Sequence, residues 1–370
     1  MPFRLLRNHI HFEAEINDGK KVELILDTGM PLPGILLFGD PALSRLGLSS
    51  SEKTRSAACG SESSPAKEAT GVTLKIGDLL LKDQKVIVSP DSVQSSACAP
   101  GQVSRQEDAL GVIGYELFSR FLVAIDYDRM LLTFSEPAGF AYQGRGNRIP
   151  LTFESNIPTV DIAVRLDGGQ SLSLKTVLDL GASHALSLNQ ESDPGIRLPA
   201  KTIESWSRLG GTEIKGRMGR VKALSLGTCF LEHPLVTFTS TRVCPMEKNG
   251  NLGNETLRRF NLIFDYSRRE LIAEPNSHLR EPFEASMSGF QALPLQNGEW
   301  IVNHLLPDSP AAEAGLREDD RLTEINGLPG GEMSVDDLYR ASTKEGASLT
   351  LSVRRGDQRF TVTLKLRPLI

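Results

Sequence analysis

The sequence predicts a mainly β protein that has two similar halves followed by a small α/β domain. The tripeptide Asp27-Thr28-Gly29 follows an apolar run, and Asp179-Leu180-Gly181 repeats this pattern later in the chain. A second motif, which begins at Gly111, recurs 139 residues later at Gly250. The character of the chain changes after about residue 275. These observations predict two duplicated β lobes, residues 1–135 and 149–276, and an α/β domain over residues 283–370.

Each Asp-x-Gly tripeptide closes a hydrophobic strand. Residues 22–26, Val-Glu-Leu-Ile-Leu, precede the first tripeptide, and residues 175–178, Lys-Thr-Val-Leu, precede the second. Asp-x-Gly is ordinary turn chemistry, so one copy alone is weak evidence. Two copies, each followed by a second matching motif, predict a pair of carboxylates brought face to face.

The second motif begins at Gly111 and again at Gly250. The residues that recur at the offset of 139 are Gly111, Gly114, Glu116, Arg120, Phe121, Asp126, Tyr127, Arg129 and Leu132. Between the motifs, Ile76-Gly77 ends 50 residues after Asp27, and Leu226-Gly227 ends 48 residues after Asp179. Three landmarks that occur twice in the same order indicate an internal duplication.

The arrangement resembles the retropepsin-like aspartic proteases, in a single-chain, two-lobed form of bacterial type. In that family an Asp-Thr/Ser-Gly loop is followed by a flap hairpin and then by an apolar-apolar-Gly segment before a short helix. Ile113-Gly114 and Leu252-Gly253 match the last element. The resemblance covers residues 3–135 and 149–274.

The resemblance implies an aspartic-type endopeptidase with Asp27 and Asp179 as its catalytic residues. Two adjacent carboxylates cannot both ionise, so they share one proton and titrate as a pair. The ionised member activates a water, and the protonated member hydrogen-bonds the scissile carbonyl. This chemistry requires no cofactor and no metal, and its substrate is a peptide or protein.

The two loops depart from the family pattern in different ways. Thr28 can make the family's cross-loop hydroxyl hydrogen bond, whereas Leu180 cannot. Two positions beyond each glycine, Pro31 stands in the first loop and Ser183 in the second. Apolar packing of Leu180 against Thr28 would preserve the geometry, and a misplaced Asp179 would destroy it. The residues expected to support the carboxylates are Thr28, Gly29, Leu180, Gly181 and Ser183.

The last part of the chain resembles a bacterial PDZ domain. The resemblance rests on the segments at residues 309–316 and 320–327, Ser-Pro-Ala-Ala-Glu-Ala-Gly-Leu and Asp-Arg-Leu-Thr-Glu-Ile-Asn-Gly. It implies a carboxylate-binding loop at Ser288, Gly289 and Phe290, and a domain that binds a peptide as an added strand. Residues 335–343 are expected to form the groove helix, and residues 349–366 a closing hairpin. Asp319 stands where the family usually has glycine.

The four cysteines fall two in each predicted lobe. This split is expected for one disulfide per lobe, Cys59–Cys98 and Cys229–Cys244, which is one of three possible connectivities, and four free thiols are the alternative. Disulfides would favour a periplasmic or extracellular location. The chain begins Met1-Pro2-Phe3-Arg4 and shows no signal peptide, as expected of a processed protein or of a cytosolic one. The cysteine spacings and the six scattered histidines argue against a metal site.

Composition excludes some other classes. The net charge is −5 and the pI is about 5.8, which argues against nucleic acid as the main partner. No apolar run approaches the roughly 18–20 residues needed to span a bilayer.

Residues 3–26 alternate apolar and polar residues and are expected to form two strands around a hairpin turn at Asn17-Asp18-Gly19. Several other segments and residues have two interpretations. Residues 49–70 form either the first flap or a loop without regular structure, whereas the glycines at residues 209–219 suit a second flap hairpin. Residues 135–148 indicate a linker between lobes. His184 is either a proton carrier or, more simply, a hydrogen-bonded strand residue. Trp206 lines the cleft or packs in the core.

The repeated charged residues favour a salt-bridged scaffold. They are Glu116, Arg120, Asp126, Glu255, Arg259 and Asp265, with Tyr127 and Tyr266 beside them. Three functions then remain open for the chain. It is an active endopeptidase whose PDZ domain binds substrate or a regulator, a catalytically inactive peptide-binding pseudoprotease, or a PDZ adaptor for which the lobes are scaffold.

Overall fold

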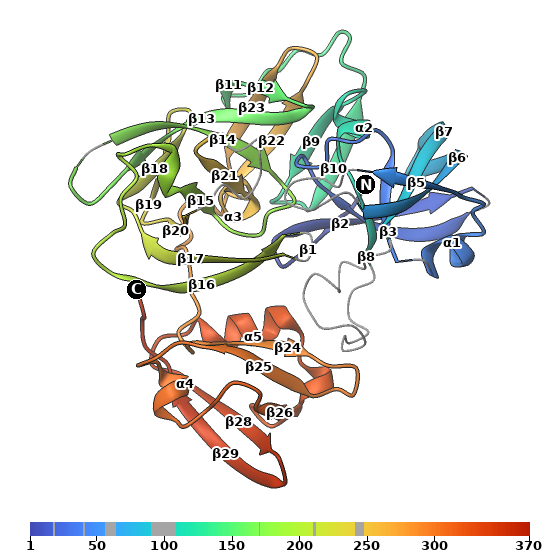
Figure 1. Ribbon diagram of the computed structural model, residues 1–370. Helices are drawn as coiled ribbons and strands as arrows, with labels where there is room; N and C mark the ends of the chain where they lie inside the picture. Colours follow the sequence, from blue (N-terminus) through green and yellow to red (C-terminus); the bar gives the residue numbers. More distant parts are fainter. Residues whose placement is uncertain are drawn as a thin grey trace.

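A computed structural model describes residues 1–17, 19–39, 41–55, 64–89, 109–169, 171–209, 212–240 and 248–370. The described chain is mainly β, as predicted, and its strands form four sheets. Figure 1 shows the fourth sheet and its helices as a separate body beside strands β16 and β17.

The N-terminal sheet has eight strands in the order β1-β2-β3-β8-β4-β7-β6-β5, and β2 also pairs with β6. The elements are β1 (Arg4–Leu6), β2 (His9–Ile16), β3 (Lys20–Leu26), β4 (Ile35–Phe38), α1 (Pro41–Leu46), β5 (Ser51–Arg55), β6 (Ser64–Ile76), β7 (Leu79–Ser89) and β8 (Ala109–Ile113). The β5–β6 hairpin occupies the position of the predicted first flap.

The start of the chain differs from the expectation of two strands before residue 27. The predicted hairpin around residues 17–19 is confirmed, because β2 and β3 pair antiparallel across it. However, a further strand, β1, also pairs antiparallel with β2. Arg7 and Asn8 both have positive φ, 50° and 61°, which makes a tight turn and splits the first strand in two.

The central sheet has ten strands in the order β16-β17-β20-β15-β21-β14-β13-β18-β19, with β12 paired to β13. The elements are β12 (Thr152–Glu154), β13 (Ile157–Arg165), β14 (Ser171–Asp179), β15 (Leu186–Asn189), the 3-10 helix η1 (Gln190–Ser192), β16 (Thr202–Leu209), β17 (Thr212–Arg220), β18 (Ala223–Leu226), β19 (Cys229–Glu232), β20 (Leu235–Thr239) and β21 (Gly250–Gly253). Strands β16 and β17 form the predicted second hairpin.

A five-stranded sheet joins the N-terminal and central regions, in the order β10-β9-β22-β23-β11. Its strands are β9 (Leu122–Asp126), β10 (Leu131–Ser135), β11 (Asn147–Pro150), β22 (Phe260–Asp265) and β23 (Glu270–Pro275). Strands β9 and β22 come from the two halves and pair antiparallel. One hydrophobic cluster runs from Phe3 to Phe283, so the two regions share a core. The predicted linker lies between β10 and β11 and has no regular structure at residues 136–146.

The C-terminal domain has its own core around Trp300. Its elements are β24 (Phe290–Pro294), β25 (Trp300–Leu305), α4 (Pro310–Glu313), β26 (Arg321–Ile325), β27 (Leu328–Pro329), the 3-10 helix η2 (Gly330–Glu332), α5 (Val335–Ser342), β28 (Ser348–Arg355) and β29 (Gln358–Lys365). The predicted helix is confirmed as α5 and the closing hairpin as β28–β29. Strand β24 lies at the edge of the sheet.

Asp319 has little effect on the C-terminal fold. It takes the left-handed conformation, φ 69°, that glycine adopts more easily. Its neighbour Asp320 is buried and accepts two hydrogen bonds from Arg355, at 2.7 and 2.8 Å. The turn is therefore formed despite the substitution.

Candidate active site

The two Asp-x-Gly loops are positioned by the same arrangement of strands. Asp27 follows β3, which pairs in parallel with β8, and Asp179 ends β14, which pairs in parallel with β21. Gly114 and Gly253 end the motifs and begin the short helices α2 (Tyr115–Phe118) and α3 (Asn254–Leu257). A Cβ on Gly114 would lie 2.0 Å from the Asp27 carbonyl oxygen, so this close approach requires glycine.

The two loops bring their carboxyl groups close together. A Cβ on Gly29 would lie 2.9 Å from Oδ1 of Asp179 and 3.0 Å from Oδ1 of Asp27, so the two carboxyl groups meet at this glycine. Oδ1 of Asp27 accepts a hydrogen bond from the Gly29 N–H at 2.6 Å, and Oδ1 of Asp179 accepts one from the Gly181 N–H at 2.9 Å. The predicted juxtaposition of the two carboxyl groups is therefore present in this structure.

The surroundings of the pair favour retention of a proton. Burial, followed by the adjacent charge of Asp179 and the hydrogen bond to it, raises the pKa of Asp27 well above its usual value. The N–H groups of Gly29 and Gly181 oppose this shift. A pair that holds one proton has both an acid and a base at one point.

Thr28 bridges the two loops, as expected. Its buried hydroxyl donates to the Leu178 carbonyl oxygen at 2.7 Å and accepts from the Leu180 N–H at 2.9 Å. The Leu180 side chain is 0% exposed and belongs to the shared core. This support across the two loops, here called the brace, is therefore one-sided. The first loop provides a hydroxyl that bonds the second loop, and the second loop provides only a buried apolar side chain.

Ser183 contacts the site in an unexpected way. It is exposed, and its carbonyl oxygen accepts a hydrogen bond from Asn8 Nδ2 at 2.9 Å. His9, next in the chain, places Nε2 3.0 Å from the Gly181 carbonyl oxygen. The β1–β2 turn therefore supports the Asp179 loop, a role that sequence reasoning missed because these contacts join residues more than 170 positions apart.

Asn251 is a second residue that sequence reasoning missed. Its Nδ2 donates to Oδ2 of Asp179 at 2.7 Å. A signal was present in the sequence, since Asn251 stands at the offset of 139 residues from Val112 and breaks the repeat there.

His184 is not a strand residue and Trp206 is not in the core, whereas the proton-carrier role of His184 and the cleft-lining role of Trp206 stay predictions. His184 lies in the loop before β15, not in a strand, and Nε2 is 3.3 Å from the Asn251 carbonyl oxygen. Burial lowers its pKa. Trp206, on β16, stacks on His304 of the C-terminal domain, with ring centroids 4.4 Å apart and planes 2° apart.

The repeated charged residues form the expected scaffold. Glu116 pairs with Arg120 at 2.5 Å, and Glu255 pairs with Arg259 at 2.9 Å. The tyrosines beside them differ in their environment: Tyr127 donates to Asn254 at 2.6 Å, whereas the Tyr266 ring stacks on Phe118. The remaining ion pairs of this set are Asp126–Arg129 and Asp265–Arg268.

The predicted carboxylate-binding loop precedes the edge strand β24. Gly289 has φ 81°, and its carbonyl oxygen accepts from the Leu306 N–H at 2.8 Å. Ser288 is buried and its carbonyl oxygen accepts from the Ala311 N–H at 3.0 Å. Phe290 belongs to the core of the C-terminal domain.

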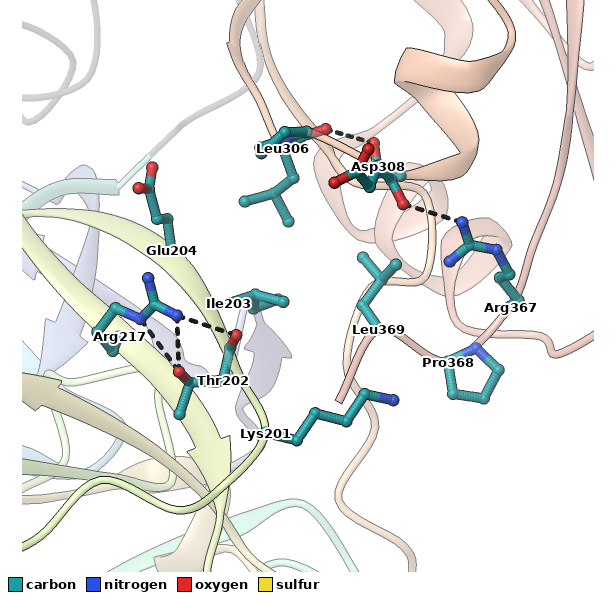
Figure 2. Close-up of a pocket in the computed structure, with 12 residues that line it drawn as sticks. Lys201, Thr202, Ile203, Glu204, Arg217, Leu306, Asp308, Arg367, Pro368 and Leu369 are labelled. Carbon is teal, nitrogen blue, oxygen red and sulfur yellow. Dashed lines mark hydrogen bonds between the residues drawn. The ribbon is translucent and has the colours of Figure 1, made fainter.

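The C-terminal domain contacts the β16–β17 hairpin beside a cavity of about 300 Å³. Gln291 Nε2 donates to the Trp206 carbonyl oxygen at 3.2 Å, and His304 lies 3.2 Å from Glu213. Figure 2 shows the cavity, with Arg217 bonded to Thr202 on one side. Its lining contains neither Asp27 nor Asp179, so it is separate from the carboxyl pair.

The predicted disulfides remain predictions. Cys59, Cys98 and Cys244 lie outside the described residues. Cys229 has a free thiol in this structure, and its sulfur accepts a hydrogen bond from Asn147 at 3.3 Å.

Comparisons with known proteins identify two domains. Residues 12–117 match the family model for an aspartyl protease, and residues 301–355 match that for a PDZ domain. The chain is also similar to the serine protease HTRA1 of Xenopus tropicalis, at 38% identity over 68 residues, or 18% of this chain. It spans only 14% of that protein. The protein is therefore mainly β, with an aspartyl protease domain and a C-terminal PDZ domain.

In the part of the chain that the structure describes, no helix is long and apolar enough to cross a membrane. No group of three or more His, Cys, Asp or Glu side chains in the same part is placed to hold a metal ion.

Proposed function

We propose that this chain is a single-chain, two-lobed aspartic endopeptidase of bacterial type, formed by internal duplication. The observation that carries the proposal is the pair of carboxyl groups of Asp27 and Asp179, one from each half, that meet at Gly29. The aspartyl protease match over residues 12–117 supports it independently. The equivalent strand pairings β3–β8 and β14–β21 support the duplication.

The reaction needs one carboxylate and one carboxylic acid. The carboxylate takes a proton from a water, and the water oxygen bonds to the scissile carbonyl carbon. The carboxylic acid gives its proton to the carbonyl oxygen, so the carbonyl carbon becomes that of a gem-diol. The C–N bond then breaks as the proton taken from the water passes to the leaving nitrogen, and one gem-diol hydroxyl returns its proton to the other carboxylate, which restores the singly protonated pair. Asp27, whose pKa is raised by burial and by Asp179, suits a pair that retains one proton above the usual carboxyl range.

The PDZ domain takes a peptide or protein, as substrate or regulator, in this proposal. Strand β24 lies at a sheet edge, where an extended peptide can add as a further strand. The stacking of Trp206 on His304 places the domain against the β16–β17 hairpin. In the related family, a hairpin at this position covers the substrate cleft. A peptide bound by the PDZ domain would therefore lie close to that cleft.

One observation favours a second function, a peptide-binding pseudoprotease. Leu180 replaces the hydroxyl residue of the family loop and leaves the brace one-sided. The intact carboxyl pair favours the active enzyme over this alternative.

The test is cleavage of unfolded casein by the full chain over a range of pH, with and without pepstatin. We expect cleavage that pepstatin inhibits and that Asp27→Asn abolishes. Cleavage that resists both would show another mechanism. Pepstatin binding without cleavage would favour the pseudoprotease, and absence of both would refute the aspartic protease proposal.

We propose a periplasmic or extracellular location, which depends on the predicted disulfides. Peptide mapping of the native protein without reduction tests this part. Four free thiols in oxidised material would remove its basis.

A further inference from the structure

The two carboxyl groups differ in the hydrogen bonds that they receive. Each accepts one from the backbone N–H of the glycine in its own loop, Gly29 or Gly181, and the Gly181 N–H also acts on Asp27 across the loops. Asp179 accepts another from Nδ2 of Asn251, at 2.7 Å from Oδ2. Among the described residues, this is the only side-chain N–H that either carboxyl group receives.

The repeat explains why only one carboxyl group has this donor. Asn251 on β21 is in register with Val177, two residues before Asp179. Val112 on β8 is in register with Ile25, two residues before Asp27. The two positions are thus equivalent, but Val112 offers methyl groups and packs against Ile25 and Met30.

We propose that Asn251 is a positioning residue that places the negative charge of the pair on Asp179 and the proton on Asp27. A hydrogen bond donated to an ionised acceptor is roughly twice as strong as one donated to a neutral acceptor. The Asn251 amide therefore stabilises the state in which Asp179 is the carboxylate. Turning the amide over would set its oxygen against that carboxylate, which is repulsive.

The other titratable groups near the pair do not supply a competing positive charge at neutral pH. Burial, assisted by Arg7, lowers the pKa of His9 to about 4. Burial also lowers the pKa of His184. Burial, assisted by Asp27, raises the pKa of the Tyr266 hydroxyl, which therefore stays neutral. The neutral amide of Asn251 is therefore the side chain that distinguishes Asp179 from Asp27.

The inference gives the carboxyl groups separate roles and, for these roles, rests on the proposed peptidase function. Asp179 is the base that receives the proton from water, and Asp27 is the acid that hydrogen-bonds the scissile carbonyl. Asn251 touches neither substrate nor water in this scheme and acts through Asp179.

The test is a ¹³C NMR titration of the full chain labelled at its aspartate carboxyl carbons. Asp27→Asn and Asp179→Asn identify the two signals. In the native chain, we expect the Asp179 signal at its carboxylate position and the Asp27 signal at its acid position throughout the pH range of the singly protonated pair. In Asn251→Val, the two signals should become more alike, and the first ionisation should move up by about one pH unit or more.

Two further variants separate positioning from structure. The exchange Val112→Asn with Asn251→Val should reverse the assignment, with the charge on Asp27. Thr176→Val is the matched control, because it removes a buried hydroxyl that bonds the Val160 carbonyl on the neighbouring strand and should leave both signals unchanged. If Asn251→Val does not fold, Asn251→Leu replaces it. Even without these variants, the titration of the native chain shows which of the two aspartates carries the charge, and this result alone supports or refutes the proposal.

The inference is overturned if the native charge lies on Asp27, if Asn251→Val leaves the titration unchanged, or if Thr176→Val changes it equally. None of these readouts requires turnover. A chain that cleaves no substrate but shows the expected titration would refute the proposed function and leave the charge assignment intact. In an active chain, the acid limb of the pH profile of kcat/KM should move up with the first ionisation.

Discussion

The Asp27 and Asp179 loops hold their carboxyl groups by the same backbone geometry but stabilise them with different side chains. In both, the carboxylate accepts the N–H two residues on. Thr28 provides a hydroxyl that bonds two backbone groups of the other loop, whereas Leu180 provides a fully buried apolar side chain. The loops are therefore equivalent in shape and complementary in chemistry.

The neighbouring strands extend this difference. Asn251 donates to Asp179, and its equivalent Val112 is apolar. The first loop supplies the bridging hydroxyl of Thr28, and the strand pair β14–β21 supplies the additional hydrogen-bond donor, the Asn251 amide. A symmetric backbone thus holds two carboxyl groups in different surroundings, because only Asp179 receives a side-chain amide among the described residues.

The largest expected effect comes from removing either carboxylate. Asp27→Asn and Asp179→Asn should each reduce kcat/KM by at least about 10²–10⁴-fold, because each removes half of one acid–base unit. The double variant should lose little more than either single one, since the two residues act together. Circular dichroism should show folded protein in all three. Retention of most activity by Asp179→Asn would refute the two-lobed model.

The two loop glycines should differ in their tolerance of alanine. A Cβ on Gly181 would lie 2.3 Å from Cγ of Asp27, whereas a Cβ on Gly29 would lie 2.9 Å from the nearest atom, Oδ1 of Asp179. Gly181→Ala must displace the Asp27 carboxyl group and should cost about 10²-fold in kcat/KM. Gly29→Ala should cost less. Equal losses would show that the backbone of the loops, and not the carboxyl contact, sets the requirement.

Thr28→Val tests the one-sided brace. It leaves the Leu178 carbonyl and the Leu180 N–H without their partner in a buried place, which should lower the free energy of unfolding by about 1–3 kcal/mol. Thr28→Ser keeps the hydroxyl and is the matched control. Urea denaturation measures both. A loss in Thr28→Ser as large as that in Thr28→Val would assign the effect to the methyl group.

Leu180→Thr tests the apolar side of the same brace. Leu180 is 0% exposed, so a hydroxyl left unpaired there should cost about 1–3 kcal/mol of stability relative to the isosteric Leu180→Val. Thermal melting and a rate assay measure the outcome. If the Leu180→Thr variant is more stable than the Leu180→Val variant, the threonine hydroxyl has found a hydrogen-bond partner in the other loop. Activity that appears only in Leu180→Thr would favour the pseudoprotease.

The sequence predicted what depends on local pattern and repetition. The alternation over residues 3–26 predicted the β2–β3 hairpin, the glycines at residues 209–219 predicted β16–β17, and the resemblance to a PDZ domain predicted β28–β29. The repeated tripeptides predicted the meeting of Asp27 with Asp179. The repeated charges predicted the salt-bridged scaffold. Each of these features follows from residues close in sequence or from a motif that occurs twice.

The missed features depend on packing between distant elements. The stack of Trp206 on His304 requires the position of one domain against another, which no periodicity encodes. The contact of His9 with Gly181 arises from the turn at Arg7 and Asn8, whose positive φ angles no strand pattern shows. Asn251 was visible as a break in the repeat, but its meaning required the register of β21 against β14.

The central claim is that Asp27 and Asp179 form one catalytic unit that shares one proton. The pH dependence of kcat/KM for an unfolded peptide substrate tests it most directly, because such a profile reports the essential acid and base of the free enzyme. The account predicts a bell-shaped profile, with activity lost when the pair gains a second proton and when it loses its last one. Asp27→Asn and Asp179→Asn should each abolish the bell. A single sigmoid that stays high at alkaline pH, or a bell that survives in either variant, would contradict the account.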